Sequence, residues 1–129
     1  MTRYPTHSWS YVVDAFQRLA DVPELAPLAS AVPAIAATRY APDLYPVKSM
    51  HTLFLYQHDR AGVEDERLAL SCEDGQLVLR YQPGRLPNRV AALRVPEAPW
   101  TKRGPDAVAL LERALYHLRW FVEYRAPAV

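Results

Sequence analysis

The chain has 129 residues, a length that predicts one domain whose core needs neither disulfides nor bound metals. Half of the residues are hydrophobic and 22% are charged, which is typical of a soluble globular protein. Fifteen basic and fourteen acidic residues leave a net charge of +1, so no overall field favours a nucleic acid or a membrane surface as the partner.

The contents of cysteine, proline and glycine narrow the class of protein further. The single cysteine, Cys72, excludes an internal disulfide and a cysteine-based zinc site. No apolar run is long enough to cross a bilayer, and residues 1–9 lack the apolar centre of a signal peptide, so a cytoplasmic location is expected. Twelve prolines against four glycines favour stiff connections over glycine-rich phosphate loops, and no cofactor is expected.

An N-terminal helix is the first predicted element. Residues 1–7 are expected to be loose, and residues 8–20 place apolar side chains at helical spacing. Ser8 or Ser10 would cap this helix, and Pro23 marks its end.

Proline interrupts the next two segments. Residues 22–37 are apolar but contain three prolines, which predicts one or two short helical pieces. Residues 38–49 are expected to form an extended, proline-stiffened connection. The following stretch, 50–58, is rich in β-formers with apolar residues on both sides, which indicates a strand covered on both faces.

Residues 67–82 carry the clearest pattern in the chain. Asp74-Gly75 is the favoured two-residue hairpin turn, and it pairs Cys72 with Leu77. This register places the large apolar side chains on one face, apart from Val78. The opposite face receives Arg67, Ser71, Arg80 and Gln82. A further strand is predicted over residues 88–96.

The last predicted element is a long helix that begins near Gly104-Pro105-Asp106 and includes residues 109–125. One broad arc of this helix is apolar and would face the core. The expected fold is therefore α+β in a single domain over residues 1–129: an N-terminal helix, proline-broken helical pieces, an antiparallel meander of three to four strands, and a long C-terminal helix packed on the sheet.

An aromatic stripe on the closing helix is the first candidate site. Tyr116, Trp120 and Tyr124 recur every four residues opposite the core arc, interleaved with Arg113 and Arg119. Tyrosine, tryptophan and arginine are enriched at interfaces, so the stripe predicts a contact surface for another protein or a second copy of the chain. The alternative is a second core layer covered by the N-terminal helical segment.

A basic loop is the second candidate site. Acidic residues concentrate between Asp59 and Asp74, whereas Arg80, Arg85 and Arg89 belong to a basic stretch that could bind an anion. The alternative is a solvated hairpin whose arginines pair with the acidic segment.

Catalytic and metal-binding motifs are weak. His51 and His58 point to opposite faces of their strand, Cys72 falls on the apolar face, and consecutive acids in the loop before residue 67 lack apolar shelter. No metal site and no catalytic residue is expected.

The leading functional expectation is a non-catalytic protein-binding domain. Small bacterial proteins of this composition often occlude a partner, as immunity proteins neutralise toxins, and an inhibitor or adaptor of this kind is expected on size and type alone. The alternative is a small enzyme or ligand-binding domain for an anionic, phosphorylated molecule, with Arg80, His58, Tyr56 and Tyr81 at its pocket. Neither a nucleic acid nor a membrane is the expected partner.

Overall fold

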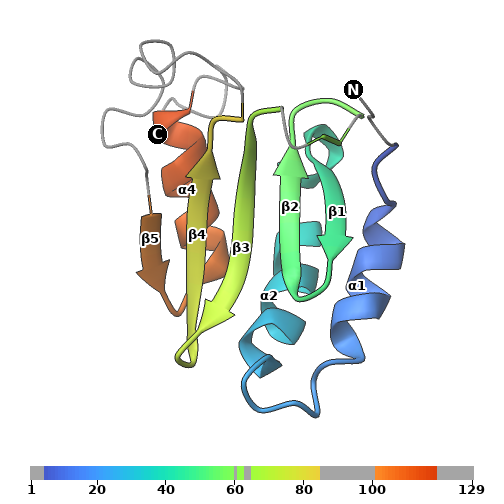
Figure 1. The fold of residues 1–129 in the computed structure, drawn as a ribbon, viewed down its shortest axis with the longest axis vertical. Coiled ribbons are helices and arrows are strands. Elements are labelled where there is room, and N and C mark those ends of the chain that lie inside the picture. The colour runs from blue at the N-terminus through green and yellow to red at the C-terminus, as the bar shows by residue number, and fades with distance from the viewer. Residues whose placement is uncertain (1–4, 60, 63–64, 85–100, 119–129) are drawn as a thin grey trace.

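The computed structural model describes residues 5–59, 61–62, 65–84 and 101–118. Over these residues the fold is α+β, as predicted from the sequence (Figure 1). The elements in chain order are α1 (Trp9–Gln17), α2 (Ala26–Ala36), the 3-10 helix η1 (Ala41–Asp43), β1 (Tyr45–Ser49), β2 (Thr52–Tyr56), β3 (Arg67–Glu73), β4 (Gln76–Gln82), β5 (Thr101–Gly104) and α4 (Ala107–His117).

The five strands form one antiparallel sheet in the order β1-β2-β3-β4-β5. Each strand pairs with the next one along the chain, so the predicted meander is confirmed, with one more strand than the upper estimate. Helices α1, α2 and α4 lie side by side behind the sheet in Figure 1 and contribute to one shared core. The described part of the chain therefore has two layers, with α1, α2 and α4 on the same face of the sheet.

Helix α1 begins where the sequence predicts. The Oγ of Ser8 accepts a hydrogen bond from the amide of Tyr11 at 3.1 Å, so Ser8 is the N-cap. Val12 and Phe16 are fully buried on the core side of the helix. The indole Nε1 of Trp9 donates to the carbonyl oxygens of Ala41 and Leu44, which holds α1 against η1.

Helix α2 is a single helix of eleven residues despite its prolines. Pro27 occupies the first turn, where its missing N–H would have no partner within the helix. Pro33 lies inside the helix and removes one backbone hydrogen bond. Burial of Leu28, Val32 and Ile35 compensates for this loss, because most helical stability comes from tertiary packing.

Residues 38–49, predicted as an extended, proline-stiffened connection, contain the 3-10 helix η1 and the edge strand β1, of which β1 is extended. Pro46 is tolerated there because the outer side of an edge strand needs no ladder donor. The outer edge of β1 also contacts residue 7, because the His7 amide donates a hydrogen bond to Pro46 O at 2.8 Å. Residue 7 belongs to the segment 1–7, which was expected to be loose. The Lys48 amide donates to His7 Nδ1 at 3.1 Å, and Thr6 hydrogen-bonds to Asp59.

The β3–β4 hairpin has the predicted register, with Cys72 opposite Leu77 and Glu73 opposite Gln76. Asp74 and Gly75 both adopt positive φ, 53° and 78°, as a two-residue turn between twisted strands requires. Turn chemistry and side-chain alternation therefore agree in this segment.

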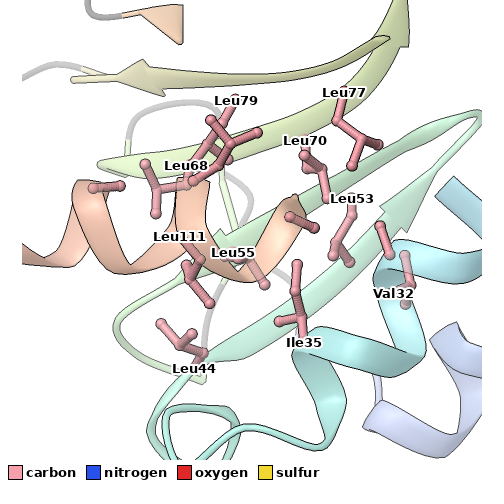
Figure 2. Packing of buried hydrophobic residues seen from close by; sticks show 14 of the residues in the cluster. Val32, Ile35, Leu44, Leu53, Leu55, Leu68, Leu70, Leu77, Leu79 and Leu111 are labelled. Carbon is pink, nitrogen blue, oxygen red and sulfur yellow. The ribbon is translucent and has the colours of Figure 1, made fainter. Parts of the chain in front are cut away.

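The core lies between the sheet and the helices. Figure 2 shows leucine side chains of β2, β3 and β4 pointing toward Val32 and Ile35 of α2 and Leu111 of α4. The sheet residues in this layer are Leu53, Leu55, Leu68, Leu70, Leu77, Leu79 and Tyr81. All seven are 3% exposed or less, so alternate positions of three central strands form one dry surface.

The C-terminal helix packs on the sheet as predicted, but its bounds differ from the sequence interpretation. Gly104 belongs to β5, a strand that the sequence did not predict, and Asp106 is the N-cap of α4. The helix ends at His117, since Leu118 is already extended with φ −76° and ψ 142°. The prediction of a helix through residue 125 is therefore corrected to eleven residues. The strand predicted over 88–96 lies outside the described residues.

Candidate functional site

The candidate site is the face of the sheet that lies opposite α1, α2 and α4, here named the helix-free face. Its residues follow from the strand register, because side chains alternate between the two faces. One row crosses all five strands: Val47, Phe54, Ala69, Arg80 and Thr101. A neighbouring row carries Ser71, Val78 and Arg103, and the pair Arg67 and Gln82 lies on the other side. Among the described residues, this face therefore carries three arginines, Arg67, Arg80 and Arg103, and the aromatic ring of Phe54.

Contacts with three described residues fix the Arg67 side chain on the helix-free face. Its Nε donates to Gln82 Oε1 at 2.6 Å, and its Nη1 donates to Tyr56 Oη at 3.0 Å. The guanidinium carbon lies 3.9 Å from the centre of the Phe54 ring, within cation–π distance. Residues from β2 and β4 therefore hold this arginine of β3 in a single orientation.

Arg80 forms a second cluster on the same face. Its guanidinium makes two hydrogen bonds to the Glu73 carboxylate, one of them Nη2 to Oε1 at 3.0 Å, and Nη1 lies 3.5 Å from Ser71 Oγ. Hydrogen bonding to Arg80 holds the pKa of Glu73 below its usual value, and the charge of Arg103 acts in the same direction. The carboxylate raises the pKa of Arg80 in turn. The pair crosses the row that contains Val78, which is fully buried.

The predicted anion site at the basic loop is only partly within the described residues. Arg80 is described, and its guanidinium is bonded to an acid of the segment 59–74, which is the pairing that the alternative interpretation expected. Arg85 and Arg89 lie outside the described residues. Anion binding at this loop stays a prediction.

The predicted aromatic stripe is likewise only partly described. Tyr116 and Arg113 lie on the exposed side of α4, where Tyr116 is 56% exposed. Arg119, Trp120 and Tyr124 lie outside the described residues and beyond the end of α4 at His117. The binding role of this stripe stays a prediction.

Other chemical candidates are not brought together into a site. Within the described residues, no three His, Cys, Asp or Glu side chains are close enough to hold a metal ion. His51 and His58 are exposed. Cys72 is half-buried against the core, and this burial, with the nearby charge of Glu73, raises the pKa of its thiol and disfavours the reactive thiolate.

A pocket of about 440 Å³ lies between α2 and the first turn of α4. Its lining is mainly apolar and includes Pro27, Ala31, Leu77, Pro105 and Val108. The volume falls within the range of small-molecule sites, which is roughly 300–1,000 Å³. However, such sites usually add several convergent polar groups, and Asp106, the charged residue of this lining, is used as the cap of α4.

Sequence reasoning placed Arg67 on the correct face of the hairpin but did not select it as a site residue. The missing information was the register between β2 and β3, which sets Phe54 opposite Ala69 and brings Tyr56 within reach of Arg67. One signal was present in the sequence: Phe54 and Tyr56 alternate with the core leucines of their strand. That alternation indicated that the second face of this strand also carries large side chains.

No protein-family model, curated protein or solved structure matches the chain. None of the helices in the described part of the chain has both the length and the apolar character needed to cross a membrane.

Proposed function

We propose that the chain is a non-catalytic protein-binding domain and that its contact surface is the helix-free face of the sheet. The observation that carries this proposal is the fixed position of Arg67 on Phe54. Arginine and aromatic residues are the types that contribute most to binding energy at interfaces. Side chains that are already ordered lose less entropy on association, so a preorganised arginine is a strong anchor.

We further propose that the partner is a different protein with an acidic surface. Among the described charges of the helix-free face, Arg67, Arg80 and Arg103 stand against Glu73 alone. A symmetric pairing of two such faces would bring like charges together, which opposes association. An acidic partner surface gains from the same charges, and long-range attraction would accelerate the encounter.

Occlusion is the mode of action that suits such a surface. The helices and the leucine core support the sheet from behind, so the exposed side chains sit on a rigid layer. A rigid face covers part of a partner without a catalytic step, as inhibitors and adaptors of the immunity type do. The proposed class is therefore an inhibitor or adaptor domain.

A matched pair of positions tests the proposed surface. A photoreactive amino acid at Val47, on the helix-free face, should crosslink the partner in cells of the source organism, whereas the same group at Tyr11, exposed on α1, should not. With the recovered partner purified, Val47→Glu should weaken the complex by at least about tenfold, and Tyr11→Glu by less than about twofold. Equal effects of the two variants, or a dimer of the chain alone in light scattering that Val47→Glu dissociates, would contradict the proposal.

A further inference from the structure

Arg67 carries a positive charge that its structural partners do not neutralise. Among the described residues, its guanidinium contacts the Gln82 amide, the Tyr56 hydroxyl and the Phe54 ring, and all three groups are neutral. Within the described residues, no carboxylate forms an ion pair with this side chain, in contrast to Arg80 with Glu73. Arg67 is half-buried, and a charge withdrawn from water is stabilised best by a counter-ion.

The Tyr56 hydroxyl is in a similar position. Its oxygen accepts the hydrogen bond from Arg67 Nη1, so its own hydrogen remains available for donation. Tyr56 is only 3% exposed, and the described residues place no acceptor on that hydrogen. Buried hydroxyl donors are normally satisfied. The same place in the fold therefore has a positive charge and a buried donor, and the described part of the chain provides no anionic acceptor for either.

We propose that Arg67 and Tyr56 form a carboxylate-binding site on the helix-free face. Two of the five N–H groups of Arg67 are used by Gln82 and Tyr56, which leaves three for a ligand. The planar guanidinium matches a carboxylate, and the ring of Phe54 fixes its plane. The Tyr56 O–H adds a further donor. This site was not among the residues that the sequence singled out for anion binding.

Charge selects a carboxylate over a phosphate group. One guanidinium with neutral neighbours balances one negative charge, whereas a phosphate monoester carries close to two. Arg80, the other arginine fixed on this face, is already bonded to Glu73. A second negative charge at Arg67 would therefore find no free guanidinium among the ordered arginines of the face.

The carboxylate has two possible sources, an Asp or Glu side chain of a protein partner and a free small carboxylic acid. The site does not depend on the proposed protein-binding function, because either source satisfies the same donors. The two sources are separated by the probes in the experiment below.

Nuclear magnetic resonance titration of the full chain tests the site. Acetate should shift the Nε–Hε resonance of Arg67 in a saturable manner, and inorganic phosphate should bind more weakly. Arg67→Lys keeps the positive charge but loses the planar guanidinium, and Tyr56→Phe loses one hydrogen-bond donor. We expect acetate to bind about tenfold more weakly to Arg67→Lys and severalfold more weakly to Tyr56→Phe. Arg103→Gln removes an equal charge from the same face and should change the affinity by less than about twofold.

A second titration uses a short peptide with one glutamate in place of acetate. Tighter binding of the peptide supports the site with a protein side chain as the source, and equal or weaker binding supports the site with a free acid as the source. Absence of a saturable shift at Arg67 in a folded wild-type chain would overturn the proposal. An Arg103→Gln effect as large as that of Arg67→Lys, or phosphate binding as tight as acetate, would also overturn it.

Discussion

Arg67 and Phe54 lie on neighbouring strands, with the guanidinium carbon of one 3.9 Å from the ring centre of the other. Gln82 and Tyr56 hold the same guanidinium through hydrogen bonds, so four side chains connect β2, β3 and β4 on the face away from the helices. The leucine core orders the opposite face of these strands. The sheet therefore has an apolar face that stabilises the fold and an opposite face that carries Arg67, Arg80 and Arg103.

Arg67 and Phe54 should be energetically coupled. Phe54→Leu and Arg67→Gln should each lower the free energy of unfolding, and the double variant should lose less than their sum. The expected coupling is about 0.5–1 kcal/mol, the size of a partly exposed cation–π contact. Urea unfolding of the four proteins measures it. Phe54→Leu combined with Arg103→Gln is the control pair, whose effects on the free energy of unfolding should be additive. A coupling of zero between Phe54→Leu and Arg67→Gln would mean that the stacked geometry contributes nothing to stability.

The ion pair between Glu73 and Arg80 should make stability depend on pH in the acidic range. The pKa of Glu73 is lowered in the folded state, mainly by hydrogen bonds from Arg80, so the unfolded chain binds the proton more tightly. The contribution of the Glu73 carboxylate to stability is therefore present above its pKa in the unfolded chain and is lost as the pH falls through its pKa in the folded chain. Wild type should exceed Glu73→Gln in urea midpoint at neutral pH, and the two should converge on acidification. A constant difference across this pH range would contradict the assignment.

The cap of α4 should contribute measurably to stability. Asp106 Oδ1 accepts a hydrogen bond from the Ala109 amide at 3.1 Å. Asp106→Ala should lower the free energy of unfolding by about 1 kcal/mol, within the usual range for caps. Asp106→Asn retains a side-chain acceptor and should cost less. Thermal or urea unfolding distinguishes the two variants, and equal losses would show that the hydrogen bond is not the source of the effect.

The outer edge of β1 should be protected by residue 7. The Lys48 amide donates to His7 Nδ1 at 3.1 Å, and the His7 amide donates to Pro46 O. His7→Ala removes the acceptor, so hydrogen exchange at the Lys48 amide should become faster while amides within the β3–β4 hairpin remain unchanged. Unchanged exchange at Lys48 would show that this contact does not persist in solution. Such a covered edge also limits strand-to-strand aggregation.

The hairpin could be predicted from sequence because all of its information is local. Asp74-Gly75 specifies the turn, and alternation on both sides specifies the buried face. The two edge strands were missed for a different reason. β1 contains Pro46, and β5 consists of three polar residues, Thr101, Lys102 and Arg103, followed by Gly104, so neither has the composition of a typical strand. Their pairing depends on neighbouring strands rather than on their own residues.

The helix end and the candidate site depend on tertiary context. Helical periodicity continues past His117 in the sequence, yet Leu118 is extended and buried, and nothing in the spacing indicated this change. The cluster around Arg67 requires the register between β2 and β3, which are separated by a loop of ten residues, 57–66. Alternation assigned Arg67 to its face, but only the register supplied Phe54 and Tyr56 as its neighbours.

Hydroxyl-radical footprinting of the chain, free and bound to the partner recovered by crosslinking, tests the proposed surface most directly. Tyr45 and Phe54 report on the helix-free face, and Tyr11 reports on the helical layer. We predict that oxidation of Tyr45 and Phe54 decreases in the complex while oxidation of Tyr11 is unchanged. Protection of Tyr11 without protection of Phe54 would place the partner on the helices and contradict the account.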